Sequence, residues 1–252
     1  MNMTSLEKVT SILNLFLNGS EELSLSEMSS LTGLHKSTVN RIASFLVKES
    51  YLEQREKRGK YSLGMKFLDF SAVIKSRIKI RDVAMRYLDQ LKHAVEESCV
   101  FMLWDGKRAV VIDSADHDSI LKASPLAMSK PPLHATSGGK IFLAAMSEME
   151  LRKYLEKSKF EKYTDRTIID KAKLRAALEQ VKKQGYSSDI DENVTGISSV
   201  AAAIKDSSDK TIGAVAVVGP TARMTTRRIK AIIPALVKTA TDISRWAGWR
   251  GN

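Results

Sequence analysis

The chain has 252 residues, of which 43% are hydrophobic and 27% charged, and this composition excludes a mostly disordered or collagen-like protein. No apolar run is long enough to cross a bilayer, the first twenty residues do not resemble a secretion signal, and Cys99 is the only cysteine, so we expect a soluble, cytoplasmic, two-domain protein without an internal disulfide. Forty Lys and Arg residues against twenty-nine Asp and Glu residues give a net charge of +11, which favours a polyanionic partner.

The first fifty residues are typical of short helices joined by tight turns. An apolar stripe with spacings of three and four predicts an amphipathic helix that ends near Gly19, and it consists of Leu6, Val9, Leu13 and Phe16. Ser24 and Glu27 have the spacing of a capping box, which predicts a second helix that ends at Gly33. A third helical segment follows at about 36–48, so we interpret the second and third helices as a helix-turn-helix.

A change of period after the third helix predicts a β-hairpin. Strand-like runs at 51–54 and 60–63 flank a charged tip, which is typical of the wing of a winged helix. The pattern is helical again at 65–76, and the segment 57–86 holds nine cations and two anions. We therefore expect a winged helix-turn-helix domain at 1–64, a linker helix at 65–79 and a second domain at 80–252.

The second domain mixes helix and strand patterns. We expect helices at about 80–97, 137–146, 147–157, 170–184 and 225–248, and strands at 100–104, 109–112, 186–190, 198–204 and 212–218. The dipeptide Asp105-Gly106 suits a tight hairpin between the first two strands. This order predicts an α+β domain built on an antiparallel sheet.

The segment 36–48 has the pattern of a DNA-reading helix. Val39, Ile42, Ala43 and Leu46 share one face, and the opposite face is polar and cationic. Arg can bind guanine, and Asn adenine, through two hydrogen bonds in the major groove, while hairpin cations would contact the DNA backbone. The candidate DNA-binding residues are Lys36, Ser37, Thr38, Asn40, Arg41, Ser44, Lys48, Lys57, Arg58 and Lys60. The pattern alone leaves open a merely solvated helix face.

The sequence contains no catalytic or metal-binding signature that we can identify. In the PLHATSGGK segment, Ile141 follows Lys140 where a phosphate-binding loop needs Ser or Thr. The four histidines have no local metal-ligand spacing, and there is no Gly-x-Ser-x-Gly elbow. We therefore predict a protein that is not an enzyme and that requires no metal and no cofactor.

Three segments resemble the isocitrate-lyase-regulator (IclR) family of bacterial transcription factors. Residues 23–70 are similar to its DNA-binding domain, with KSTVNR opening the recognition helix and YSLG closing the wing. PPLHATSGGKIFLAAM at 131–146 and GYSSDIDENVTGISSVAAAIKD at 185–206 resemble its second domain. The resemblance implies a winged helix-turn-helix domain, a linker helix and a GAF-like effector-binding domain with an antiparallel sheet.

The resemblance also implies where an effector would bind. Carried over by motif, the effector-binding residues are Ser137, Gly138, Gly139, Asp189, Ser199, Ala216 and Val218. The helix N-terminus in this set would suit a carboxylate, with Lys140 either strengthening that site or covering the helix surface, and we expect His134 to be structural. The family often has Cys or hydroxyl residues at the last three positions, so we expect a less polar pocket, although ordinary core substitutions would give the same pattern.

One departure concerns the end of the recognition helix. Ser50 stands where the family usually has glycine, so the sequence does not by itself predict the left-handed helix terminus expected there.

These features predict a ligand-responsive transcriptional regulator, with repression of a catabolic operon favoured by the resemblance. It would sense a small carboxylate-bearing or aromatic metabolite and bind a pseudopalindromic double-stranded DNA operator as a homodimer or homotetramer. We expect no membrane partner. Two other hypotheses stay open: a constitutive DNA-binding protein whose second domain only oligomerises, and a small-carboxylate enzyme with an appended DNA-binding domain.

Overall fold

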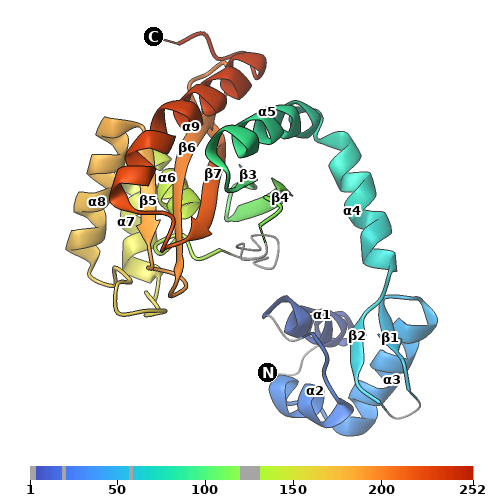
Figure 1. Ribbon diagram of the computed structural model, residues 1–252. Coiled ribbons are helices and arrows are strands. Elements are labelled where there is room, and N and C mark those ends of the chain that lie inside the picture. The colour runs from blue at the N-terminus through green and yellow to red at the C-terminus, as the bar shows by residue number, and fades with distance from the viewer. Residues whose placement is uncertain (1–3, 19–20, 57–58, 120–130, 252) are drawn as a thin grey trace. The chain divides into compact units, whose positions relative to one another are not determined.

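The computed structural model describes residues 4–18, 21–56, 59–119 and 131–251, and the chain divides into two compact units, residues 1–77 and 78–252 (Figure 1). The described elements of the first unit are, in chain order, α1 (Ser5–Leu15), η1 (Phe16–Asn18), α2 (Leu25–Thr32), α3 (Lys36–Lys48), β1 (Leu52–Gln54), β2 (Tyr61–Leu63) and α4 (Lys66–Arg77). Helices α2 and α3 form the predicted helix-turn-helix, and β1 pairs with β2 in the predicted antiparallel hairpin.

Local signals position the helix-turn-helix. The predicted capping box is present, because the Ser24 side chain accepts from the Glu27 amide and the Glu27 carboxylate accepts from the Ser24 amide. Gly33 ends α2 in the left-handed conformation with φ 68°, which glycine adopts without a Cβ penalty. The apolar faces of the helices and the hairpin then close a small core that includes Ile12, Met28, Val39, Leu46 and Leu52.

Ser50 adopts the left-handed conformation, with φ 61°, which the sequence alone does not predict at this position. The Ser50 amide donates to Val47 O at 3.0 Å, and the Tyr51 amide donates to Leu46 O at 2.8 Å. These two bonds are those of a Schellman motif, which satisfies the last carbonyls of α3 and turns the chain into β1. The end of the hairpin lies against this turn. Gly64, which follows β2, is so close to it that a Cβ at Gly64 would lie 2.2 Å from Ser50 O.

The second unit is the predicted α+β domain with an antiparallel sheet. Its described elements are α5 (Lys79–Val95), β3 (Ser98–Trp104), β4 (Ala109–Ala115), α6 (Ser137–Ala145), α7 (Glu148–Lys157), α8 (Lys171–Gln184), β5 (Tyr186–Ile190), β6 (Ile197–Lys205), β7 (Thr211–Pro220) and α9 (Thr226–Trp246). The strands form one sheet in the order β4-β3-β7-β6-β5, and every neighbouring pair is antiparallel. None of the helices within the described ranges has the length and apolar composition of a membrane span.

The two faces of the sheet carry side chains of different size. Toward α5 and α9 the central strands present large residues such as Val200, Ile204 and Val217. Toward α6 the same strands present alanines, including Ala201 and Ala216. Because these side chains are small, α6 packs close to the sheet, and the residues of α6 from 137 to 144 are buried on every side. This close packing brings the N-terminus of α6 against the sheet.

Candidate nucleic-acid interface and ligand site

Helix α3 presents the predicted division into an apolar and a polar face. Val39, Ile42, Ala43 and Leu46 are buried. The candidate residues that the structure leaves exposed on this helix are Lys36, Ser37, Asn40, Arg41, Ser44 and Lys48, whereas Thr38 is half-buried. Within the described ranges, the charged groups of its Lys and Arg residues make no ion pair. They are therefore available to a polyanion.

The start of α3 is held by a histidine. The Ser37 amide donates to His35 Nδ1, and the Ser37 hydroxyl lies 2.9 Å from the same nitrogen. This cap occupies one of the unpaired amides at the helix N-terminus. It also restrains the Ser37 side chain on the polar face.

The hairpin supplies the second part of the predicted interface. Lys60 is exposed and immediately precedes β2, while the predicted contacts Lys57 and Arg58 lie outside the described residues. Leu23 forms an isolated bridge with Tyr61, which ties the hairpin to the segment before α2. The hairpin is thereby fixed beside the helix-turn-helix.

The sequence analysis did not single out Phe45, whose side chain is 56% exposed. It lies four residues after Arg41, so the two side chains are neighbours on the surface of α3. An aromatic side chain so exposed beside a cationic face is a candidate for an apolar contact with a thymine methyl group. In the sequence, its spacing of four from Arg41 is the signal that places Phe45 next to the polar face.

In the second unit, the structure brings together three of the predicted effector residues. The hydroxyl oxygens of Ser137 and Ser199 lie 2.7 Å apart, and Ser199 Oγ lies 3.5 Å from Asp189 Oδ2. Ser199 is paired with Asp189 on β5 and with Val218 on β7. Ala216 lies one side-chain row further along β7, paired with Ala201. The set is thus a contiguous patch of the sheet beneath the first turn of α6.

The amides at the start of α6 are partly used within the protein. The Gly139 amide donates to the Thr136 hydroxyl at 3.2 Å, as in an N-cap. A Cβ at Gly139 would lie 2.4 Å from Leu133 Cα, and one at Gly138 would lie 2.2 Å from Met102 Cε. Both glycines therefore permit close packing around the predicted ligand site.

Beside this patch lies a buried ion pair that the sequence analysis missed. Lys140 and Glu192 are 3% and 8% exposed, and Lys140 Nζ lies 2.5 Å from Glu192 Oε1. Lys140 Nζ also donates to Ser188 O at 2.9 Å. From the sequence, Lys140 is expected either to strengthen the carboxylate site or to cover the helix surface. Neither role describes it fully, because its ammonium group is directed into the interior rather than over the surface.

Two carboxyl groups share the charge of Lys140. Asp189 Oδ1 accepts from the Glu192 amide at 2.7 Å, and burial raises the pKa of Asp189 to about 7. Burial also raises the pKa of Glu192, with the Lys140 charge opposing that change, and Glu192 Oε2 has no hydrogen-bond partner within the described structure. The site is therefore rich in acceptors and can hold or release a proton near neutral pH.

His134 packs outside this network, as a structural residue. Its Nε2 lies 3.0 Å from Glu161 O, and its ring contacts Phe160 and Tyr163. Burial lowers the pKa of His134 and favours the neutral ring. His134 thus has the hydrogen bond and the packing expected of a structural residue.

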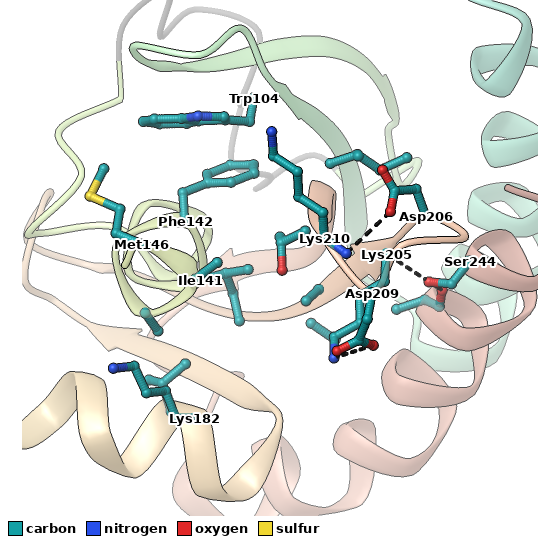
Figure 2. Close-up of a pocket in the computed structure, with 18 of the residues that line it drawn as sticks. Trp104, Ile141, Phe142, Met146, Lys182, Lys205, Asp206, Asp209, Lys210 and Ser244 are labelled. Carbon is teal, nitrogen blue, oxygen red and sulfur yellow. Dashed lines mark hydrogen bonds and ion pairs between the residues drawn. The ribbon is translucent and has the colours of Figure 1, made fainter. Parts of the chain in front are cut away.

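A large pocket lies at the other end of α6. It has a volume of about 1050 Å³, and its lining includes Trp104, Phe142, Met146, Lys182 and Lys210 (Figure 2). None of the seven predicted effector residues is among its lining residues. The pocket and the Ser137 patch are thus different places on the same sheet and helix.

Comparison with known proteins identifies both units. Residues 72–245 match the family model "Bacterial transcriptional regulator IclR C-terminal", and residues 5–56 match "IclR helix-turn-helix domain". The HTH-type transcriptional regulator XynR of Escherichia coli K12 is 29% identical over 245 residues, covering 97% of each chain. The transcriptional repressor IclR of the same strain is 26% identical over 243 residues, covering 95% of this chain and 88% of that protein.

Solved structures of this type have the same fold. The Thermotoga maritima IclR structure has 28% identity and a TM-score of 0.73, covering 98% of this chain and 100% of the other. An IclR homolog from Microbacterium hydrocarbonoxydans, complexed with 4-hydroxybenzoate, has a TM-score of 0.79 at 21% identity, covering 97% of this chain and 99% of the other. The likeness spans both units of the chain.

Proposed function

This chain belongs to the IclR family of bacterial transcriptional regulators, and from that premise we propose that it represses a catabolic operon and is released from its operator by a small effector. The family pairs a helix-turn-helix domain with an effector-binding domain, and the relatives are transcriptional regulators rather than enzymes. Repression is supported by the relatives named as repressors. Its site of action is the bacterial cytoplasm, where the chromosomal DNA lies.

The DNA-reading surface in this proposal is the polar face of α3 together with the hairpin. Arg41 and Asn40 would contact base edges, Ser37 would contact a phosphate or a base, and Phe45 would pack on a thymine methyl group. Lys57, Arg58 and Lys60 would contact the DNA backbone. The exposure and unpaired charge of the α3 face carry this assignment.

The effector site in this proposal is the Ser137–Ser199 patch. The hydroxyl of Ser137 and the amide of Gly138 would donate to a carboxylate, while Ala216 and Val218 would form an apolar floor for an aromatic ring or a short chain. A protonated Asp189 would add a further donor. The 4-hydroxybenzoate bound to the Microbacterium homolog is a ligand of this chemical type.

Self-association is the third part of the proposal. Helix α4 exposes Leu68 (59%), Phe70 (48%), Val73 (51%) and Ile74 (60%), and α1 exposes Leu6 (80%). By their spacing Phe70, Val73 and Ile74 share one side of α4, and exposed apolar surface of this kind marks an interaction site. A second copy of the chain would cover it, and a two-fold dimer would match a pseudopalindromic operator. A homotetramer would pair two such dimers, with residues 65–79 as the linker between the domains at 1–64 and 80–252.

One experiment tests the proposal as a whole. The full chain is used to select bound duplexes from a random DNA pool, with and without a metabolite extract. We expect a pseudopalindromic sequence to be enriched, and the extract to reduce its recovery. Recovery without any enriched sequence would contradict regulated operator binding. An enriched sequence that no extract affects would instead support a constitutive DNA-binding protein.

A further inference from the structure

The pocket at the C-terminal end of α6 has an apolar floor. The rings of Trp104 and Phe142 are stacked, with centroids 5.2 Å apart and an interplanar angle of 27°. Ile141 and Val181 are buried beside them, and Met146 is half-buried. Figure 2 shows Trp104 and Phe142 lying one above the other on one side of the hollow. Apolar lining of this kind is typical of small-molecule sites.

Small side chains leave this space open. Ala144, Ala202 and Ala203 line the pocket where larger residues would fill it. The hollow of about 1050 Å³ is partly open to solvent and has aromatic rings on its floor, so a ligand could enter it and rest on them. The hollow is large enough for a drug-sized molecule.

The charged rim of the pocket favours an anion. Each acidic group of the rim already accepts hydrogen bonds within the protein. Asp105 accepts from the amides of Lys107 and Arg108, and Glu150 accepts from Ser147. Asp206 accepts from Ser208, and Asp209 accepts from Lys205 and Trp249. Within the described ranges, Lys107, Lys153 and Lys210 line the same pocket and their ammonium groups make no ion pair. These bonds leave the carboxylate charges in place, so the lining carries five lysines against four carboxylates. Its net positive charge and the three lysines without an ion pair to a described residue favour an anion.

Lysine side chains lie close to the aromatic floor. In Figure 2 the Lys210 side chain extends beside the stacked rings of Trp104 and Phe142. Lys153 also lines the pocket, three residues after Glu150 on α7. Hydrogen bonds from Ser147 lower the pKa of Glu150, and the charges of Lys210 and Lys153 both lower it further. A molecule resting on the rings would thus have its acidic group within reach of two cations.

We propose that this pocket is a second ligand site, separate from the Ser137–Ser199 patch, that binds an amphipathic organic anion with its apolar part on Trp104 and Phe142 and its acidic group between Lys153 and Lys210. Both ligand sites involve α6, whose first turn carries Ser137 and whose last turns carry Ile141 and Phe142. The pocket's assignment depends on its own lining and does not require the proposed DNA contacts.

Tryptophan emission provides a direct test. The chain has three tryptophans, so the variant Trp246→Phe/Trp249→Phe retains only Trp104 as a reporter. Because Trp249 lines the pocket and donates to Asp209, the parent chain is titrated beside this variant as a reference. The probes are octanoate and the neutral 1-octanol, which differ in charge at similar chain length. We expect octanoate to change the Trp104 emission saturably, and Lys153→Ala/Lys210→Ala in this background to weaken its binding about tenfold, equivalent to about 1.4 kcal/mol, with little effect on octanol.

Matched variants test whether octanoate binds in this pocket and through these two lysines. Lys171→Ala/Lys230→Ala removes two exposed lysines that do not line the pocket, so it should leave octanoate affinity unchanged. Asp189→Asn alters the other site and should also leave the Trp104 signal unchanged. The proposal is overturned if octanoate gives no saturable change, if the control lysine pair weakens binding equally, or if Asp189→Asn abolishes the signal.

Discussion

The hydroxyl of Ser137, in the first turn of α6, lies 2.7 Å from the hydroxyl of Ser199 on β6. The two residues are 62 positions apart in the chain, and their contact joins the helix N-terminus to the sheet. A ligand that binds at this helix start would lie beside that bond. The pair is therefore the geometric centre of the proposed effector site.

Substitution of Ser199 should affect the effector response. We expect Ser199→Ala to reduce the ability of the metabolite extract to release the selected operator, because one polar group of the site is lost, while operator affinity without extract stays unchanged. The control is Ser198→Ala, since Ser198 is also buried but bonds Thr221 instead of Ser137. Equal effects of the two variants in a mobility-shift titration would refute the role of Ser199.

The contribution of Asp189 to the stability of the second unit should fall as pH rises toward neutrality. The pKa of Asp189 is raised to about 7 by burial, whereas an unfolded aspartate titrates near about 4. Between these values the native state holds a proton that the unfolded state has released, so the free energy of unfolding decreases with rising pH. Asp189→Asn removes this contribution, and its stability relative to the parent should increase between about pH 4 and 7.

Urea unfolding followed by tryptophan emission measures this effect, because all three tryptophans lie within residues 78–252. Asp206→Asn is a control of opposite sign, since hydrogen bonds from Ser208 lower the pKa of Asp206. Its stability relative to the parent should decrease as pH rises through the acidic range. A stability difference for Asp189→Asn that does not vary with pH would contradict the prediction.

The Lys140–Glu192 pair should show strong coupling. Lys140→Met leaves the Glu192 carboxylate buried without its cation, and we expect a loss of about 3–5 kcal/mol in the free energy of unfolding near neutral pH. The double variant Lys140→Met/Glu192→Gln should lose much less than the sum of the two single variants, because neither charge then remains. Additive losses in the same urea experiment would show that the two groups do not stabilise one another.

Short-range patterns predicted most of the architecture. The capping box at Ser24, the Asp105-Gly106 hairpin and the strand-like run at 198–204 are local signals, and each element that they predicted is present. The expected final helix at 225–248 is observed as Thr226–Trp246, a shift typical of fraying helix ends. The fold class was therefore accessible from the sequence together with the family resemblance.

The interior of the ligand site was less accessible. Lys140 and Glu192 are 52 residues apart, and only the tertiary fold brings them together, so neither periodicity nor motif spacing reveals the pair. Phe45 lies four residues after Arg41, but this spacing alone does not show that so large an apolar side chain is exposed. The pocket at Trp104 depends on which residues of β3, β6 and β7 lie together at one end of the sheet, and this information requires the strand register.

Glycine at position 50 should stabilise the first unit. Ser50 has φ 61°, and this conformation costs a non-glycine residue about 1 kcal/mol, so Ser50→Gly should raise the stability of α3 by about that amount. Gly33→Ala is the reverse test, because φ is 68° and a Cβ there would meet no atom within 4 Å, which leaves backbone strain as its main cost. Hydrogen exchange of α3 amides checks both. Faster exchange in Ser50→Gly would contradict the argument.

The most direct test of the central claim compares Arg41→Ala with Lys60→Ala on the selected operator and on a scrambled duplex. Because Arg41 is assigned to base reading, its loss should cost about 1–3 kcal/mol on the operator and little on the scrambled duplex. Because Lys60 is assigned to the DNA backbone, its loss should weaken both complexes and reduce the salt dependence by about one unit of slope. Equal losses on both duplexes for Arg41→Ala would contradict the account.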